Sequence, residues 1–290
     1  MKQILFSLFA GVSLLAVSAV NAAQLKALVI DGQNNHNWKG TTPHLVKALE
    51  SSGLFKVEVA TAPGKGGDMK AFTPKFSDFD VIVSNYNGEP WSAETKAAFE
   101  AYVKNGGGFV CVHAADNSFP EWKEYNRMIG IGGWGGRTEK DGPYVRFIDG
   151  KVAKVTDAGR GGSHGQQHDF VVEVRDASHP ITAGLPEKWL HVKDELYDRL
   201  RGPAEDLNVL ATAFANPAKG GSGHQEPMLM TTSYGKGRCF HTTLGHSPEC
   251  MKCVGFIVTL QRGAEWTATG KVTQKVPADF PTAEKLSVRE

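Results

Sequence analysis

The amino-acid sequence predicts an α/β fold in which helices cover both faces of a mostly parallel sheet. Short apolar segments typical of buried strands alternate with segments of helical periodicity, which is the pattern of consecutive strand–helix–strand units. No linker rich in proline or serine and no run of charge divides the 290 residues, so we expect one large domain. Several predicted strands end in a histidine, and ligands of such sheets bind at the carboxyl ends of the strands.

The first half of the chain predicts four strands and two helices. The strands cover 25–30, 55–60, 80–84 and the glycine-led segment 106–112, and the helices cover 41–51 and 92–104. Pro43 stands early in the first helix, where proline is tolerated, and Ser92 suits the N-cap of the second.

The second half predicts two further strands, a β-hairpin and a closing helix. The strands cover 170–174 and 208–214, the hairpin joins 228–233 to 238–243 through Tyr234-Gly235-Lys236-Gly237, and the helix covers 251–262. Two glycine-rich segments, 130–136 and 159–165, are expected to form loops over the ligand-binding edge of the sheet.

Residues 1–23 have the pattern of a cleavable signal peptide. Lys2 is followed by an apolar run and by small residues at Ala22 and Ala23. A retained membrane anchor is the alternative, but the run is short for a span. We therefore expect a periplasmic or secreted protein that has no membrane contact after cleavage. The polar segment 271–290 forms a tail that could wrap a neighbouring molecule or stay loose.

The charge balance argues against nucleic acid as a partner. Loss of Lys2 with the signal peptide leaves 31 basic residues against 31 acidic ones. Such a surface gives no electrostatic reason to bind nucleic acid or an anionic membrane.

The four cysteines suit a structural role better than a catalytic one. Cys111 and Cys239 lie in apolar strands and are expected in the core. Cys250 and Cys253 form a Cys-x-x-Cys pair, for which a local disulfide or two free thiols is favoured over a redox function or half of a metal site.

Histidines are the candidate metal ligands. His36, His113 and His246 each follow a predicted strand, so we expect them to converge at one edge of the sheet. His164 and His168 stand four residues apart in a glycine-rich segment, and His168 is the better ligand candidate although it could equally begin the next strand. For each histidine taken singly, an ordinary solvated or hydrogen-bonded role is the alternative.

Asp194-Glu195-Leu196-Tyr197 places carboxylates beside a tyrosine. Adjacent side chains point apart, so at most one carboxylate is expected to face the site, and we favour Glu195 as ligand or general base. Tyr197 would donate a hydrogen bond, and His113 is the alternative acid or base. A solvated charged turn is the competing interpretation.

Four residues are candidates for binding a sugar, because amides suit hydroxyl groups and aromatic rings stack on sugar rings. They are Asn35, Trp38, Asn85 and Tyr86. Trp91 and Trp134 are further stacking candidates, and each of the aromatic residues could instead be a packing residue.

An ordered set of motifs resembles the ThuA-like family over roughly 26–266. The motifs are Asn-His-Asn-Trp, Gly-Gly-Gly-Phe-Val-Cys-Val-His, His-Pro-Ile-Thr-Ala-Gly-Leu-Pro, Asp-Glu-Leu-Tyr and Gly-Lys-Gly-Arg-Cys-Phe-His-Thr-Thr-Leu-Gly-His. The resemblance implies a flavodoxin-like three-layer sandwich similar to class I glutamine amidotransferases. It also implies a ThuA-like domain over 24–270 and a role in carbohydrate metabolism, often beside enzymes of 3-keto-glycosides. His113 stands where amidotransferases carry their nucleophilic cysteine, so glutaminase activity is not expected.

We therefore expect an exported enzyme that acts on a sugar or 3-keto-glycoside as an isomerase, hydratase, lyase or hydrolase. A divalent ion, zinc or manganese, would be its cofactor, with no nucleotide cofactor, and a homo-oligomer is compatible with the sequence. The alternative is a non-catalytic carbohydrate-binding or accessory protein on the same scaffold. A hydrolase that uses Cys111 as nucleophile is a weaker third interpretation, because that residue lies inside a strand.

Overall fold

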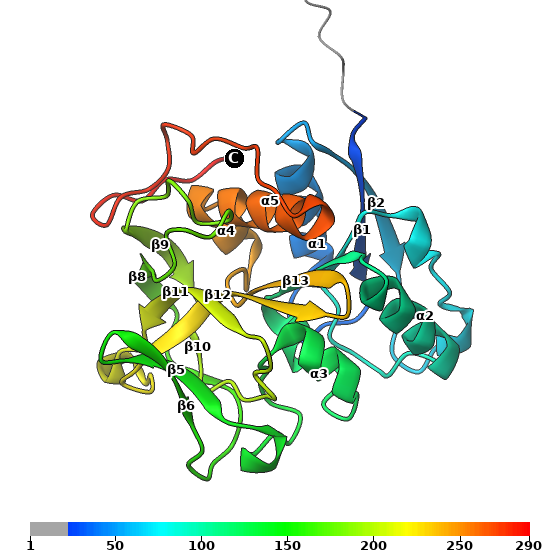
Figure 1. Ribbon diagram of the computed structural model, residues 1–290, viewed down its shortest axis with the longest axis horizontal. Coiled ribbons are helices and arrows are strands. Elements are labelled where there is room, and N and C mark those ends of the chain that lie inside the picture. Colours follow the sequence, from blue (N-terminus) through cyan, green and yellow to red (C-terminus); the bar gives the residue numbers. More distant parts are fainter. Residues whose placement is uncertain (1–22) are drawn as a thin grey trace, which may run out of the picture.

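The computed structural model describes residues 23–290 as a mixed α/β fold around one large sheet (Figure 1). The sheet has eleven strands, and its main path runs β2-β1-β3-β4-β13-β12-β11-β8-β9. Strand β5 pairs with β12 and with β6 beside this path, and β7 and β10 form a separate two-stranded ladder. The expected signal peptide lies almost wholly in residues 1–22, outside the described residues.

The strands are β1 (Leu25–Asp31), β2 (Phe55–Thr61), β3 (Val81–Ser84), β4 (Gly108–Val112), β5 (Tyr144–Ile148), β6 (Lys151–Val155), β7 (Ser163–His164), β8 (His168–Val174), β9 (Lys188–Asp194), β10 (Tyr197–Asp198), β11 (Asn208–Phe214), β12 (Gln225–Tyr234) and β13 (Gly237–Thr242). The α-helices are α1 (Trp38–Glu50), α2 (Ala93–Lys104), α3 (Lys123–Ile129), α4 (Pro248–Met251) and α5 (Val254–Thr269). Short 3₁₀ helices are η1 (Met69–Ala71), η2 (Phe76–Asp78), η3 (His113–Asn117), η4 (Glu139–Asp141) and η5 (Pro217–Lys219).

The expectation of a mostly parallel sheet is wrong for half of the molecule. Strands β2, β1, β3, β4 and β13 pair in parallel. Every pairing from β13 through β12, β11 and β8 to β9 is antiparallel. Two-residue turns join β12 to β13 and β5 to β6, and a connection this short permits only antiparallel neighbours. The longer loops from β8 to β9 and from β11 to β12 contain no α-helix that could serve as a crossover. The predicted hairpin of β12 and β13 is confirmed.

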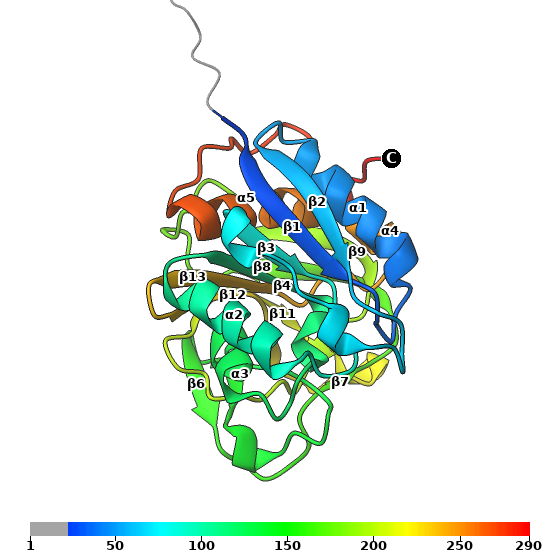
Figure 2. The ribbon, with the colours of Figure 1, turned by 90° about the vertical axis from the view of Figure 1, so that its right-hand side faces the viewer.

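Helices pack on both faces of the parallel half, as the alternation of buried residues predicts. In β1, Ala27 and Val29 face the core beneath α1 and α5, whereas Leu28 and Ile30 face the core beneath α2 and α3. Figure 1 shows α1, α4 and α5 on one side of the sheet and α2 and α3 on the other, and Figure 2 shows β1 and β2 near one edge. These layers hold the strand ends of the parallel half rigidly in place.

Two predicted helices begin at different residues from those expected. Helix α1 starts at Trp38 because the Asn37 side chain accepts a hydrogen bond from the Gly40 amide and caps it. The closing helix is split, because Cys253 stands in an extended conformation between α4 and α5. The Ser92 cap of α2 is confirmed, since its hydroxyl accepts from the Thr95 amide.

The C-terminal tail packs on its own domain rather than lying loose. The amide of Leu190 donates to the Thr282 carbonyl, and the amide of Val254 donates to the Ser287 carbonyl. The second bond satisfies a donor at the start of α5 that no helical carbonyl can reach. Among residues 23–290, no helix is both long and apolar enough to cross a bilayer.

A buried carboxyl group makes stability depend on pH. Glu226 of β12 is 1% exposed, and burial, which outweighs the opposing contacts of Ser222 and Arg146, raises its pKa to about 7. The native state therefore binds more protons than the unfolded state between about pH 4.5 and 7, and the free energy of unfolding falls as pH rises through this window.

We predict that Glu226→Gln abolishes this dependence, because the amide keeps the shape of the side chain and never ionises. From pH 5 to pH 8, the variant should gain up to about 3 kcal/mol of unfolding free energy relative to the wild type, as measured by urea titration. The exposed Glu205 gives a control, Glu205→Gln, for which no such change is expected. An equal effect of Glu226→Gln at both pH values would contradict the assignment.

Candidate functional site

Six polar side chains from both halves of the sheet meet at one edge. His36 lies in the loop after β1, His113 opens η3 directly after β4, and His246 follows β13. His164 lies in β7, Glu195 between β9 and β10, and Tyr197 in β10. The parallel half contributes its strand ends and the antiparallel half contributes a wall opposite them.

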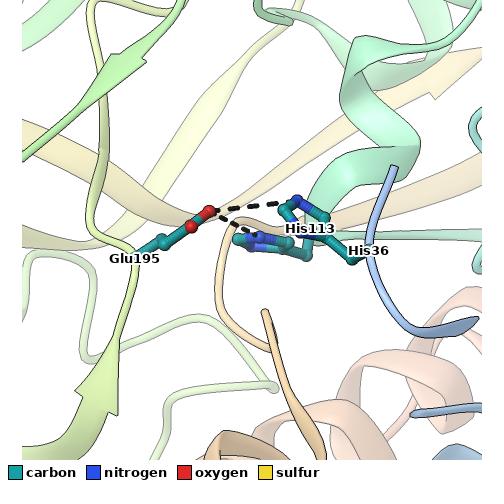
Figure 3. Close-up of side chains that lie close together, drawn as sticks. All are labelled: His36, His113 and Glu195. Carbon is teal, nitrogen blue, oxygen red and sulfur yellow. Dashed lines mark ion pairs between the residues drawn. The ribbon is translucent and has the colours of Figure 1, made fainter. Parts of the chain in front are cut away.

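Glu195 is the centre of this cluster. Its Oε2 atom lies 3.5 Å from His113 Nε2 and 3.9 Å from His36 Nε2, as Figure 3 shows. Its Oε1 atom lies 3.2 Å from His246 Nε2 and 3.7 Å from His164 Nε2. The Nε2 atoms of four imidazole rings therefore surround one carboxylate.

Backbone carbonyls fix the tautomer of two of these rings. His113 Nδ1 donates to the Thr243 carbonyl at 2.6 Å, and His164 Nδ1 donates to the Gly165 carbonyl at 2.8 Å. With Nδ1 protonated, a neutral ring presents the lone pair of Nε2, which is the atom aimed at Glu195. A hydrogen bond from the second ring nitrogen to a carbonyl is also the usual support of a metal-binding histidine.

His113 adopts a backbone conformation that residues with a side chain seldom occupy. Its φ angle is +46°, in the left-handed region, which costs about 1–2 kcal/mol for such residues. It is 3% exposed and directly follows the buried strand β4, so the turn holds the imidazole at the strand end in one orientation. Backbone strain of this kind concentrates at functional sites.

The site keeps the carboxylate charged and favours the neutral form of two of its imidazoles, His36 and His246. Although burial opposes it, the imidazole of His113, followed by those of His246 and His164, lowers the pKa of Glu195 to about 2. Burial, followed by the proximity of His113, lowers the pKa of His36 to about 4, and burial likewise lowers the pKa of His246. His113 is the exception, because Glu195 and Asp194 overcome its burial and raise its pKa. Burial also raises the pKa of Tyr197, which therefore stays protonated as a donor.

Asp194 ties the two halves of the site together. This carboxylate is fully buried and accepts hydrogen bonds from the amides of Glu195 (2.7 Å), Gly245 (2.8 Å) and His246 (3.1 Å). It also accepts from His191 Nε2 at 2.9 Å. Despite burial, Cys253 and Asp194 raise the pKa of His191 to about 10, so an imidazolium balances the carboxylate. One side chain thus fixes Glu195 and His246 relative to each other.

The cluster fits a divalent metal ion. His113 Nε2 and Glu195 Oε2 are buried and have no hydrogen-bond partner among the described residues, which is costly unless a further group satisfies them. Two ligand atoms of a tetrahedral zinc ion lie about 3.4 Å apart, since each is about 2.1 Å from the ion. Glu195 Oε2 lies 3.5 Å from His113 Nε2 and 3.9 Å from His36 Nε2, close to that spacing, and ligand atoms of these three residues all lie within 4.8 Å of one another. His246 Nε2 lies 3.2 Å from the other oxygen of Glu195. Imidazole and carboxylate ligands suit zinc and manganese.

A second group that could hold an ion is less suitable. Ligand atoms of Asp194, His246 and Cys250 all lie within 4.8 Å of one another. Asp194 is already saturated by N–H donors, and Cys250 Sγ donates to the Lys193 carbonyl. Burial, with Asp194 acting in the same direction, raises the pKa of Cys250, so its thiolate is strongly disfavoured.

Four members of the cluster line a hollow of about 380 Å³, which we call the cluster hollow: His36, His164, Glu195 and Tyr197. Amides of Asn35, Asn87 and Asn117 line it together with Trp134. The Trp134 ring lies 4.7 Å from that of Tyr197, centroid to centroid. Glu195 is the one carboxylate among the described residues that line this hollow.

Tyr197 and Asn35 both reach the same histidine nitrogen. The Tyr197 hydroxyl lies 3.2 Å from His36 Nε2, and Asn35 Nδ2 lies 3.1 Å from it. An ion bound to His36 would occupy the lone pair of Nε2. The Tyr197 hydroxyl and the Asn35 amide would then be free to donate to a ligand in the hollow.

Four of the candidate residues lie outside the cluster in the structure. His168 begins β8, and its Nδ1 donates to the Gln166 carbonyl outside the cluster. Asn85 is buried, where its amide donates to Thr41 and Thr42 and anchors α1. Tyr86 is fully buried against Trp91 and Phe119, and its hydroxyl donates to the Glu89 carbonyl. Trp38 lines a neighbouring hollow instead.

Two residues that line the cluster hollow, Asn87 and Asn117, are not predicted from the sequence. Asn87 follows β3 by three residues, so the strand-end argument could have found it. Asn117 closes η3, a 3₁₀ turn with no distinctive sequence pattern. His164 enters the cluster through the β7–β10 ladder, which the sequence gives no reason to expect.

The cysteines are free thiols in the interior. Cys111 is 1% exposed within β4, and burial raises its pKa well above the usual value, so the structure opposes its use as a nucleophile. Cys250 and Cys253 are likewise buried and unpaired, in agreement with one of the two favoured alternatives.

Comparison with known proteins identifies relatives. A family model named ThuA and described as trehalose utilisation matches residues 26–267. A ThuA-like protein from Parabacteroides merdae is 51% identical, with a TM-score of 0.90 over 92% of this chain and 98% of that one. A ThuA-like protein from Bacteroides uniformis is 20% identical, with a TM-score of 0.59 over 89% of this chain and 96% of that one, which shows similarity of fold alone. No functionally curated protein matches the chain.

We predict that Asp194→Asn destabilises the fold strongly. The amide would direct N–H groups at existing donors and leave His191 without its counter-charge, and breaking a buried pair of this kind typically costs about 3–5 kcal/mol. The matched control is Asp279→Asn, which breaks an exposed pair with Arg289 and should cost less than about 1 kcal/mol. Chemical denaturation measures both values, and equal losses would contradict the role given to Asp194.

Proposed function

The chain belongs to the ThuA family, named for trehalose utilisation, and from this premise we propose that it is an exported, metal-dependent enzyme acting on a sugar or 3-keto-glycoside. Family membership supports a carbohydrate-related function. Export rests on the signal-like pattern of residues 1–23. Metal dependence rests on one observation, the convergence of four histidine Nε2 atoms on Glu195.

We assign His36, His113, His246 and Glu195 as the ligands. His113 is held by the Thr243 carbonyl, and Glu195 and His246 by Asp194, whereas the His164 side chain is 37% exposed at the wall of the cluster hollow. A divalent ion held by this set would polarise the carbonyl group of a keto-sugar and stabilise negative charge developing on its oxygen.

The amides and Trp134 of the cluster hollow suit a hydroxylated ring. Asn35, Asn87 and Asn117 each offer both a donor and an acceptor to hydroxyl groups. A pocket of about 380 Å³ falls within the usual range for small ligands.

The residues favour proton transfer next to a carbonyl over cleavage by a pair of carboxylates. Ordinary glycosidases need two carboxyl groups that flank the bond, and Asp194 is turned into the interior. His164 Nδ1 donates to the Gly165 carbonyl, so Nε2 of the neutral ring can accept a proton from the carbon beside a ketone. Tyr197 keeps its proton and can donate it to an oxygen of the substrate. Isomerisation, hydration or elimination would each use these two steps.

A non-catalytic sugar-binding protein is the competing function, because the amides and Trp134 would serve binding equally well. The two functions differ in turnover and in the need for an ion.

We predict that the mature protein purified without chelator contains about one equivalent of zinc or manganese. His113→Ala and His246→Ala should each lose most of it, because each removes a ligand from a four-residue set. His168→Ala is the matched control and should keep its metal, since that ring bonds the Gln166 carbonyl and is not among the four that contact Glu195. Elemental analysis of the four proteins tests this, and an apo wild type after incubation with both ions would contradict the ligand assignment.

We predict that Tyr197→Phe keeps the metal and loses activity on a 3-keto-glycoside. Removal of a general acid typically lowers kcat by about 10²–10⁴-fold. The measurement is steady-state kinetics beside elemental analysis of the same sample. Absence of turnover by a metal-loaded wild type that still binds the sugar would support the binding protein instead.

A further inference from the structure

A second hollow adjoins the cluster hollow, and two residues line both. It has a volume of about 520 Å³, and Asn35 and Asn87 line both. The two amides are bonded to each other, since Asn87 Nδ2 donates to Asn35 Oδ1 at 2.6 Å. A ligand too long for the cluster hollow would therefore cross this amide pair and enter the second hollow.

The floor of the second hollow is rigid. Gln33 is buried, accepts from the Glu89 amide at 2.9 Å and donates to the Pro63 carbonyl at 2.7 Å. Glu89 Oε2 accepts from the Gly66 amide at 2.8 Å. A side chain at Gly88 would meet Gln33 within 2.4 Å, so glycine is required for this close approach. These bonds hold Glu89 in place before any ligand arrives.

The walls combine an aromatic ring with two opposite charges. Trp38 is half-buried at the start of α1. Lys65 lies in the loop after β2 and Glu89 in the loop after β3, and both line the hollow. Their charges cancel, which gives no selection for an anion such as a phosphate group. An indole ring beside a carboxylate, an ammonium group and amides matches the apolar face and hydroxyl groups of a neutral sugar-like ring.

We propose that the second hollow is a binding subsite for a neutral hydroxylated unit joined covalently to the unit in the cluster hollow. The preferred substrate would then be a glycoside of at least two units, with the reacting unit beside Glu195 and the other between Trp38, Lys65 and Glu89. This inference rests on the proposed function and adds to it the size of the substrate and the residues that select it.

The test compares methyl glucoside with cellobiose, each oxidised at C3, by calorimetric titration of the metal-loaded protein. The wild type should bind the two-unit ligand at least about tenfold more tightly, which corresponds to 1.4 kcal/mol. Trp38→Ala and Lys65→Ala should each reduce this advantage and leave the affinity for the methyl glucoside unchanged. Lys39→Ala is the control, because its ammonium lies 5.5 Å from the Trp38 ring but the residue does not line the hollow.

Three results would overturn the proposal. Equal affinity for both ligands in the wild type would remove the subsite and leave the proposed function standing. Tighter binding of a glucose phosphate than of cellobiose would show that the hollow selects an anion. Binding of neither oxidised ligand would refute the subsite together with the proposed substrate class, and elemental analysis of the same sample would show whether the metal site survives.

Discussion

The buried carboxylate of Asp194 is the constraint on which the site depends. Its four N–H donors come from His191 on β9, from Glu195 beyond the end of that strand and from the loop after β13 that carries His246. A charge in the interior is tolerated only when it is fully hydrogen-bonded and balanced, and here both conditions are met. The position of Glu195 relative to His246 is therefore set by a side chain that never faces the ligand.

The site stands where the two halves of the sheet meet. Strands β4 and β13 are parallel neighbours, so their ends deliver His113 and His246 to one edge. The antiparallel strands beyond β13 bring β9 and β10 back over this edge with Glu195 and Tyr197. The parallel half thus supplies three imidazole rings, and the antiparallel half supplies the carboxylate of Glu195. The mixed sheet is thus a functional feature, because a wholly parallel sheet would leave the strand ends without the opposite wall.

The sequence predicts the part of the site that follows from strand ends. His36, His113 and His246 were found because an apolar strand followed by glycine or a polar loop is visible in the sequence. Residue type alone suggests Asn85 and Tyr86 as sugar-binding residues, and the structure buries both: the amide of Asn85 anchors α1, and Tyr86 packs against Trp91 and Phe119. His164 and Asn117 depend on contacts between segments far apart in the chain. No local pattern encodes those contacts, nor does one encode the antiparallel half of the sheet.

The claim that one divalent ion sits among His36, His113, His246 and Glu195 can be tested most directly by anomalous diffraction. Crystals of the mature protein would be soaked in zinc or manganese and measured at the absorption edge of each metal. We expect one strong peak about 2.0–2.2 Å from the three Nε2 atoms and from a Glu195 oxygen. Absence of a peak at Glu195, or a peak bound only by other residues, would contradict it.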